Sequence, residues 1–249
     1  MRNRLLKSFA LVALLATVFV SCTTNNYNGD VVDLGLPSGV KWATCNLGAK
    51  NPWEYGKYYA WGETKVKDDY SWETYKYCNG TDTTLTKYCN NAEFGLNGYT
   101  DALKTLLPDD DAATSVLGSD YSMPTNADWN ELSSQCYWVW TTNYNNQNVS
   151  GYIVYKAKLA DDKGTKVFGD STTSASYFLS DTHIFLPAAG YCNYILFGSD
   201  GWYGNYWSGS LRDGRSEYAH HCHISSSFVK QSDFACRCYG LSVRPVRRK

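Results

Sequence analysis

The chain has 249 residues, of which 43% are hydrophobic, 19% charged and 16% aromatic. This composition is typical of a folded domain and excludes an intrinsically disordered protein. Its 23 basic and 24 acidic side chains leave no basic field that would hold a polyanion, so nucleic acid is not an expected partner.

The first 22 residues have the pattern of an export signal. Arg2, Arg4 and Lys7 precede an apolar run from Phe9 to Val20, and Ser21 stands directly before Cys22. The run has 12 residues, fewer than the roughly 20 that a helix needs to cross a bilayer.

A small residue directly before a cysteine is similar to the end of a bacterial lipoprotein signal, in which Cys22 becomes the lipidated first residue. Phe19 departs from the usual leucine, and ordinary secretion is the alternative. We therefore expect a signal peptide at 1–21, a flexible polar tether at 22–29 and a single domain at 30–249, since no second linker or internal repeat follows residue 30.

Two segments of this domain are predicted to be helical. Residues 103–117 carry Asp109 to Asp111, acids that suit the positive end of a helix, although an acidic run is also a potential calcium ligand. In residues 124–136, Thr125 or Asn126 can act as N-cap, and Trp129, Leu132 and Cys136 share one helical face.

Short runs typical of β-strands fill much of the remaining sequence. They are VKWATC (40–45), KYYAWG (57–62), GYIVYKAKL (151–159), HIFLPA (183–188), AHHCHI (219–224) and LSVRPV (241–246). A few helices beside many short strands predict an α+β domain.

Eight cysteines follow Cys22, in a chain that we expect to be exported to a disulfide-permissive compartment. Cys78 and Cys89 bracket a polar loop and are the one favoured pair. Free buried cysteines are the alternative.

Several segments, taken in order, resemble one family. They are residues 32–63, LPDDDAA (107–113), MPTNADWNEL with CYWVW (123–140), IFLPAAG (184–190), GNYWSGS (204–210) and YGLSVRPV (239–246). Together they resemble the Fibrobacter succinogenes major paralogous domain family of bacterial lipoproteins. The resemblance implies a C-type-lectin-like fold related to formylglycine-generating enzymes, with the strand around Val31 to Leu34 near the one at Leu241 to Val246.

The resemblance does not imply an activity, because fold does not fix function. Cys236 and Cys238 fall on one face of an expected strand and could hold copper(I), but their spacing departs from that of formylglycine-generating enzymes. If residues 219–224 pair with residues 234–239, His221 and His223 could join these cysteines in a zinc site. Since no catalytic motif is present, we expect a non-enzymatic protein without metal or cofactor.

Residues 199–239 are rich in Tyr, Trp, Ser, Gly, His, Arg and Asp, a mixture typical of binding surfaces. We expect Trp202, Tyr203 and Tyr206 to be aromatic anchors, and Trp207, Ala219, Cys222, Ile224 and Arg237 to be scaffold. The predicted contact residues are Trp202, Tyr203, Asn205, Arg212, Asp213, Arg215, Tyr218, His221, His223, Phe228, Lys230, Asp233 and Phe234.

A further resemblance concerns this segment. Lectin-fold proteins with a similar tail are targets of diversity-generating retroelements, which leave NNY codons and so deplete Lys, Glu, Gln, Met and Trp. From Gly209 to Tyr239, 31 residues, only Glu217, Lys230 and Gln231 belong to that set, against roughly seven from average usage.

The sequence thus predicts an outer-membrane lipoprotein of the cell envelope that binds an extracellular protein or glycan through its C-terminal surface. The alternatives are a metal-dependent enzyme and a structural or adhesion component of the envelope.

Overall fold

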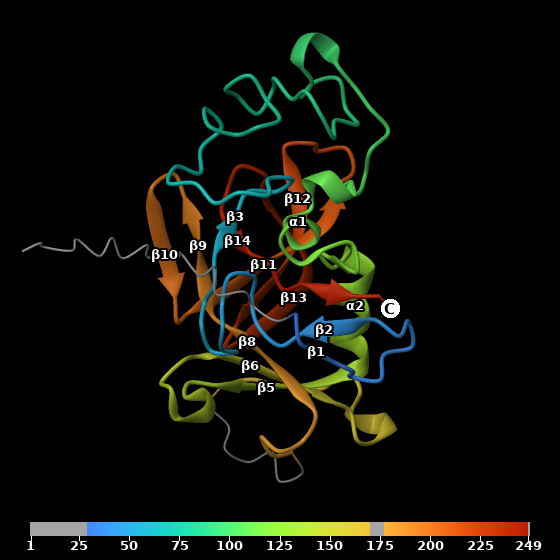
Figure 1. The fold of residues 1–249 in the computed structure, drawn as a ribbon, viewed down its shortest axis with the longest axis vertical. Coiled ribbons are helices and arrows are strands. Elements are labelled where there is room, and N and C mark those ends of the chain that lie inside the picture. Colours follow the sequence, from blue (N-terminus) through green and yellow to red (C-terminus); the bar gives the residue numbers. More distant parts are fainter. Residues whose placement is uncertain (1–28, 170–176, 249) are drawn as a thin grey trace, which may run out of the picture.

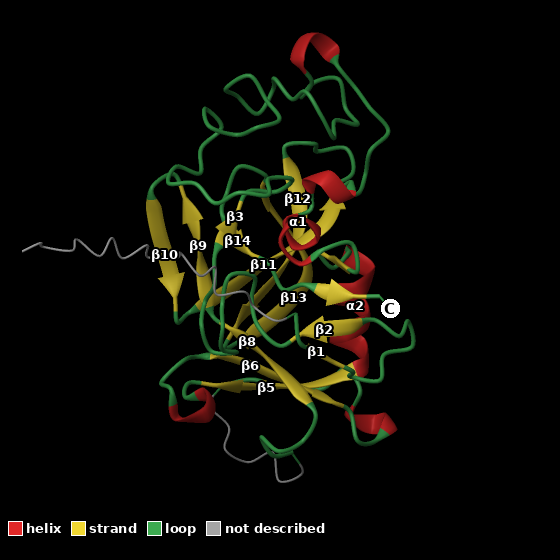
Figure 2. Ribbon diagram, viewed as in Figure 1, coloured by secondary structure: helices red, strands yellow, loops and turns green. Residues whose placement is uncertain are grey.

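The computed structural model describes residues 29–169 and 177–248. The predicted signal peptide, Cys22 and the tether up to residue 28 lie outside the described residues. The described part is rich in β-structure, with short strands in three sheets and two α-helices (Figure 2). It is compatible with the predicted α+β class.

The first and last strands of the described chain lie in one four-stranded sheet. Its strands, in spatial order, are β1 (Val31–Val32), β2 (Lys41–Ala43), β15 (Val246–Arg247) and β4 (Tyr121–Ser122). The predicted closeness of the two strands is confirmed, with β2 inserted between β1 and β15.

The central sheet has seven strands and carries the C-terminal segment. Five of them run in the order β10 (Leu196–Asp200), β9 (Ala189–Asn193), β11 (Tyr203–Leu211), β12 (Tyr218–Ser225) and β13 (Phe228–Cys236). In addition, β14 (Leu241–Ser242) pairs with β11 and with β3 (Tyr58–Tyr59). The strand β10 forms one edge of this sheet, on the left in Figure 1.

The third sheet lies at the bottom of Figure 1. Its strands run in the order β7 (Lys166–Val167), β5 (Cys136–Thr141), β6 (Gly151–Lys156) and β8 (His183–Pro187). Each run that the sequence predicts as a strand overlaps at least one strand of the structure.

The helix α2 (Asn126–Gln135) forms as predicted. Thr125 is its N-cap, and a capping box joins the Thr125 side chain to the backbone of Asp128 while the Asp128 carboxylate accepts from the backbone of Thr125. Trp129, Leu132 and Cys136 are all fully buried, so the predicted apolar face packs against the core.

The helix predicted at 103–117 is shorter than expected. Its first residues are extended, because the backbone of Leu106 and that of Thr105 pair with residues at the end of β11. The helix α1 (Ala112–Leu117) begins only after Asp111, whose carboxylate accepts from the backbone N–H groups of Ala113 and Thr114. Single 3₁₀ turns occur at Leu96–Gly98, Pro108–Asp110, Tyr144–Asn146 and Ala160–Asp162.

Two large apolar clusters fill the domain. One lies among the three sheets and α2 and contains Trp42, Trp129, Trp138, Tyr206 and Ile224. The other joins the central sheet to residues 59–113, the cyan-to-green loops at the top of Figure 1. Trp207, Ala219, Cys222, Ile224 and Arg237 are fully buried, which confirms their prediction as scaffold.

The eight cysteines within the described residues are free thiols, so the predicted Cys78–Cys89 disulfide is wrong for this structure. The Cys78 thiol donates to the carbonyl of Trp72, at 3.0 Å, and that of Cys89 to the carbonyl of Asn91, at 3.2 Å. The core that this chain buries explains why cross-links are not needed.

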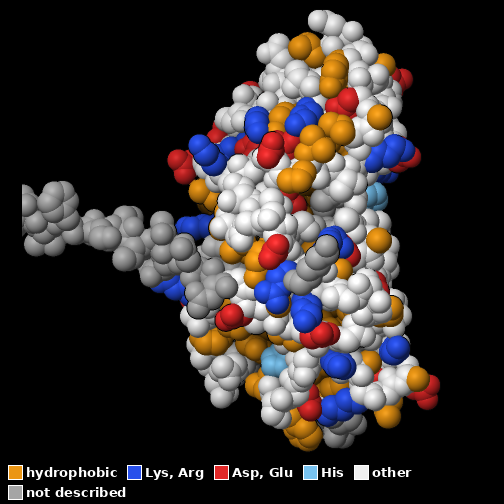
Figure 3. Space-filling model, turned by 45° about the vertical axis from the view of Figure 1, so that its right-hand side comes forward, with side chains coloured by type: hydrophobic (Ala, Val, Ile, Leu, Met, Phe, Trp, Pro, Cys, Tyr) orange, Lys and Arg blue, Asp and Glu red, His pale blue; other side chains and the backbone are white. Residues whose placement is uncertain are grey.

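Among the described residues, no helix is long and apolar enough to cross a membrane. Lys and Arg side chains are interspersed with Asp and Glu over the face shown in Figure 3, with no extended region of one sign. This mixture agrees with the balanced composition.

Candidate functional site

Most of the predicted contact residues lie on or beside the β12–β13 pair and divide between its two faces. Side chains alternate along a strand, and residues directly opposite each other share a face. His221 pairs with Asp233, whereas Tyr218 pairs with Cys236. Because Tyr218 and His221 are an odd number of positions apart, they project to opposite sides of the sheet.

The first group, here called the histidine face, contains Tyr203, His221, His223, Phe228, Lys230 and Asp233. The His223 ring lies 5.4 Å from that of Tyr203 and 4.8 Å from that of Phe228, between ring centroids. The ammonium of Lys230 lies 5.1 Å from the centroid of the Phe228 ring. The histidine face is therefore a packed aromatic surface with one cation at its border.

The second group, here called the arginine face, contains Arg212, Arg215, Tyr218 and Phe234. The guanidinium of Arg212 lies 3.5 Å from the centroid of the Phe234 ring. Arg215 lies 5.3 Å from the Tyr218 ring and forms an ion pair with buried Glu217. Asp213 is exposed beside this group, where its carboxylate lies 3.0 Å from Lys104.

Three predicted surface residues are buried, so the expectation that they lie on the surface that contacts a protein or glycan is wrong. Tyr206 is fully buried, and its hydroxyl donates to the carbonyl of Pro187. Asn205 is 7% exposed and donates to the carbonyl of Gly190, at 3.3 Å. His221 is 4% exposed because Trp207 packs against it, with 6.2 Å between ring centroids.

A surface that the sequence analysis identified only in part, through Trp202 and Tyr203, lies at the two ends of β10. Of the fifteen large apolar side chains exposed in the described part of the chain, six lie within residues 194–203. They are Tyr194, Ile195, Leu196, Phe197, Trp202 and Tyr203, here called the apolar hairpin surface. Trp202 is 75% exposed and Leu196 is 70% exposed.

One signal in the sequence could have revealed this surface. The run YILF at 194–197 follows the strand AGYCN, and a tight turn after it would place the run on the next strand of a hairpin. A continuous apolar run is normally interpreted as buried, however. Only the strand order shows that β10 has a single neighbour, β9, among the strands of residues 29–169 and 177–248.

His221, His223 and Asp233 form a compact cluster of potential metal ligands. One donor atom from each lies within 4.8 Å of the others. His223 Nδ1 lies 3.2 Å from Oδ2 of Asp233. Burial lowers the pKa of both histidines, most strongly that of His221, so both rings are neutral at pH 7.

The two cysteines of the expected zinc site do not belong to this cluster. The strands β12 and β13 pair antiparallel, but residues 219–224 lie opposite residues 229–235 instead of 234–239. This register puts Cys236 opposite Tyr218, and Cys238 lies beyond the end of β13. Cys238 is buried, and burial raises the pKa of both thiols. In their place, the register brings Asp233 to the histidines.

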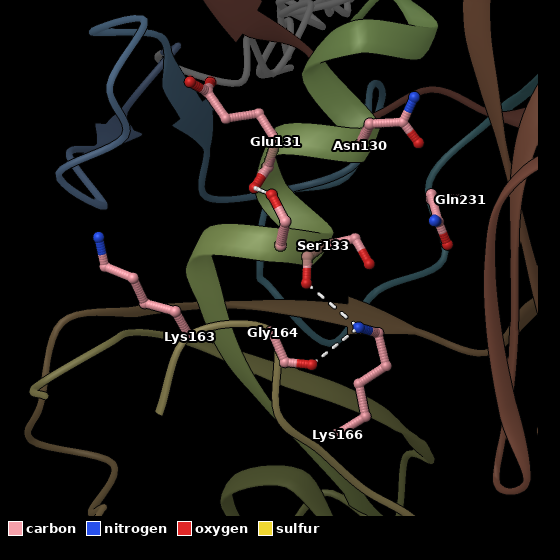
Figure 4. Close-up of a pocket in the computed structure, with 8 residues that line it drawn as sticks. Asn130, Glu131, Ser133, Lys163, Gly164, Lys166 and Gln231 are labelled. Atoms are coloured by element: carbon pink, nitrogen blue, oxygen red, sulfur yellow. Dashed lines mark hydrogen bonds between the residues drawn. The ribbon is translucent and has the colours of Figure 1, made fainter. Parts of the chain in front are cut away.

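An open depression of about 700 Å³ lies between α2, β7 and β13 (Figure 4). In it, the ammonium of Lys166 donates to the backbone carbonyls of Ser133 and Gly164, each at 3.1 Å. Ser133 belongs to the last turn of α2, where carbonyls lack partners within the helix. Lys166 therefore serves as a C-terminal cap, and burial lowers its pKa.

Comparison with known proteins adds no assignment. No protein-family profile matches the chain, and no curated protein or solved structure matches it significantly.

Proposed function

We propose that this protein is a cell-envelope lipoprotein whose domain binds a partner protein through the apolar hairpin surface, without catalysis. The lipid anchor at Cys22, the outer-membrane location and the C-type-lectin-like fold follow from the export-signal pattern and the family resemblance. The pairing of both β1 and β15 with β2 supports that fold, because it joins the two ends of the domain in one sheet.

The exposure of the apolar hairpin surface carries this proposal. Isolated apolar side chains are common on protein surfaces, but a concentration of exposed ones in a short segment indicates an interaction site. Here Tyr194 to Phe197 are four consecutive exposed residues. The Phe197 ring packs against that of Tyr58 in β3, with 5.6 Å between ring centroids, so the surface is in contact with the central sheet.

The position of this surface indicates how a partner binds. Within the described part of the chain, β10 is an edge strand of the central sheet, and an edge strand can pair with an added strand on its outer side. Strand addition supplies backbone hydrogen bonds, while Leu196 and Trp202 supply apolar area. Natural proteins usually cover or charge such an edge when no partner uses it.

The side chains favour a protein partner over a glycan. Sugars stack on aromatic rings flanked by hydrogen-bonding groups, whereas Ile195 and Leu196 offer only aliphatic area. Aliphatic and aromatic side chains together form the core of protein–protein interfaces.

The test compares three purified variants in the same screens of extracellular proteins and glycans. Leu196→Ser and Trp202→Ser alter the proposed surface. Leu159→Ser is the matched control, since Leu159 is 68% exposed and lies in a 3₁₀ turn region far along the chain from β10.

We expect at least one protein in the screen to bind the native chain. Leu196→Ser and Trp202→Ser should weaken this binding by at least about tenfold, which corresponds to about 1.4 kcal/mol, while Leu159→Ser leaves it unchanged. Binding of glycans alone, or equal loss in all three variants, would contradict the proposal. Concentration-dependent self-association that Leu196→Ser abolishes would instead identify a structural component that binds its own copies.

A further inference from the structure

The strand pairing of β12 and β13 brings three donor groups together on the histidine face. His221 lies directly opposite Asp233, and His223 lies two positions along β12, on the same side. An irregularity in the register between His221 and His223 leaves one extra residue on β13, so His223 lies opposite Lys230 instead of Gln231. The Asp233 carboxylate lies within 4.8 Å of a ring nitrogen of each histidine.

Within the described part of the chain, one nitrogen of the buried His221 ring has no partner and is therefore available to a metal ion. Its Nδ1 atom is buried and has no hydrogen-bond partner among the described residues. An unpartnered buried polar atom destabilises a fold, and each such atom in a native structure needs an explanation, for which a bound ion is one of the few available. His221 lies within the cluster whose other two members already contact each other.

We propose that His221, His223 and Asp233 bind one Zn²⁺ ion. Two imidazole nitrogens and one carboxylate oxygen form a donor set that zinc accepts, and three protein ligands leave a fourth tetrahedral position for water or for a group of a bound partner. The two imidazoles exclude calcium and magnesium as the preferred ions, because those ions take oxygen ligands.

The three side chains need to move only slightly to reach the ligand separations of a tetrahedral zinc site. Bonds of about 2.0–2.2 Å in a tetrahedral site place neighbouring ligand atoms about 3.3 Å apart. The His223–Asp233 pair, at 3.2 Å, already meets this condition. The widest separation in the cluster is within 4.8 Å, so rotation of the half-buried side chains of His223 and Asp233 closes the set around an ion.

The surroundings stabilise the site and limit its exposure. Trp207, Tyr203 and Phe228 pack against the two imidazoles, which holds the rings in place and excludes water from one side. Lys230 is the cation that opposes metal binding, since it pairs with His223 across the strands. Its ammonium extends over the Phe228 ring instead.

The test measures Zn²⁺ binding to the full chain by titration calorimetry and by metal analysis after dialysis, with Co²⁺ absorption as a spectroscopic readout. Asp233→Asn and His223→Ala each remove one ligand at a half-buried position. His220→Ala is the matched control, because His220 pairs with Phe234 and therefore lies on the opposite face of the same strand.

We expect one Zn²⁺ per chain and a tetrahedral Co²⁺ spectrum. Each ligand variant should weaken binding by at least the roughly 10–100-fold that loss of an outer partner of a metal ligand costs, and His220→Ala should leave it unchanged. Circular dichroism identifies any variant that has lost its fold, in which case His221→Gln provides a second test of the same set.

Three results would overturn the site. They are the absence of stoichiometric Zn²⁺, unchanged binding in both ligand variants, and binding that disappears in Cys236→Ser or Cys238→Ser instead. The last result would identify a cysteine site. None of these results depends on the apolar hairpin surface. The zinc proposal would therefore stand even if no partner protein binds there.

Discussion

Arg244 donates a hydrogen bond from Nε to Oδ1 of Asn46, at 2.9 Å, across 198 positions of sequence. Its guanidinium, fully buried, also donates to the carbonyls of Ala43, Thr44 and Phe185. Since Ala43 ends β2 and Phe185 lies in β8, one side chain links two of the three sheets. All of these acceptors are neutral oxygens.

Arg244→Lys should destabilise the domain by at least about 3 kcal/mol. A lysine has a single nitrogen, so several buried carbonyls would lose their donor, and each unpaired buried group costs about 1–3 kcal/mol. Urea denaturation monitored by tryptophan fluorescence measures the change. The exposed-face variant Arg212→Lys should change the free energy of unfolding by no more than about 0.5 kcal/mol, and an equal loss in both would refute the special role of Arg244.

Gly190→Ala should disrupt the apolar hairpin surface. Gly190 has a φ of +67°, and a Cβ atom there would lie 2.2 Å from the carbonyl oxygen of Gly198. We expect backbone strain to lower the free energy of unfolding by about 1–3 kcal/mol. Binding of the partner protein should be lost as well. Gly198→Ala is the control, because a Cβ atom at Gly198 would meet no atom within 4 Å. A Gly190→Ala variant as stable as Gly198→Ala would contradict the described hairpin.

Stability should fall steeply between pH 4 and pH 2 because of Asp110. Burial acts to raise the pKa of this carboxyl, but hydrogen bonds from Lys87, Tyr77 and Tyr88 outweigh it and lower the pKa from 3.8 to about 2. The ionised form therefore stabilises the fold above about pH 4, and this contribution, about 2 kcal/mol, is lost as the pH falls toward 2.

Asp110→Asn should remove that contribution at pH 7 and flatten this part of the pH profile of unfolding. Asp109→Asn, at an exposed neighbouring position, is the control. An Asp110→Asn variant that keeps the native pH profile would show that another carboxyl is responsible.

Thiol labelling should distinguish two classes of cysteine. Cys78 and Cys236 are partly exposed, whereas Cys45, Cys89, Cys136, Cys192, Cys222 and Cys238 are buried. Burial also raises the pKa of the Cys136 thiol to about 12 and that of Cys192 to about 11, which disfavours the reactive thiolate. In a Cys22→Ser chain, we expect at most two labelled thiols in the folded state and all eight after denaturation. A Cys78–Cys89 disulfide found by non-reducing peptide mapping would contradict this expectation.

If a retroelement diversifies residues 209–239, sequence variation among cells should concentrate at positions whose side chains are exposed to solvent. Arg212, Asp213 and Phe234 should vary among cells of one population, while buried Arg237 stays fixed. Sequencing of codons 199–240, with codons 30–190 as internal control, measures this. Equal variation in the two regions would end the diversification hypothesis.

Local patterns predicted the parts of the fold that local interactions determine. The cap and the apolar face of α2 are encoded within about a dozen residues, and its bounds came out close to the prediction. Residues 103–107 were predicted as helix because they lead into an acidic cluster. They are extended because Leu106 bonds to Gly209, a partner about a hundred residues away that no local pattern reveals.

The candidate sites depend on register and strand order, which the sequence does not specify. Alternation put His221 and His223 on one face, but only the register, in which His221 lies opposite Asp233 and Tyr218 opposite Cys236, selects Asp233 over the cysteines as their neighbour. Likewise, Tyr206 and Trp202 are both aromatic residues of one segment, yet the first is in the core and the second is among the most exposed side chains.

The insertion of β15 between β2 and β4, and of β14 between β3 and β11, also has a consequence for biosynthesis. A chain that emerges N-terminus first can complete neither sheet until residues 241–247 have left the ribosome or the translocation pore. Until then its strand edges stay unpaired and open to holdase chaperones. A nonsense product that lacks the last nine residues should therefore be degraded instead of accumulating as a nearly complete domain.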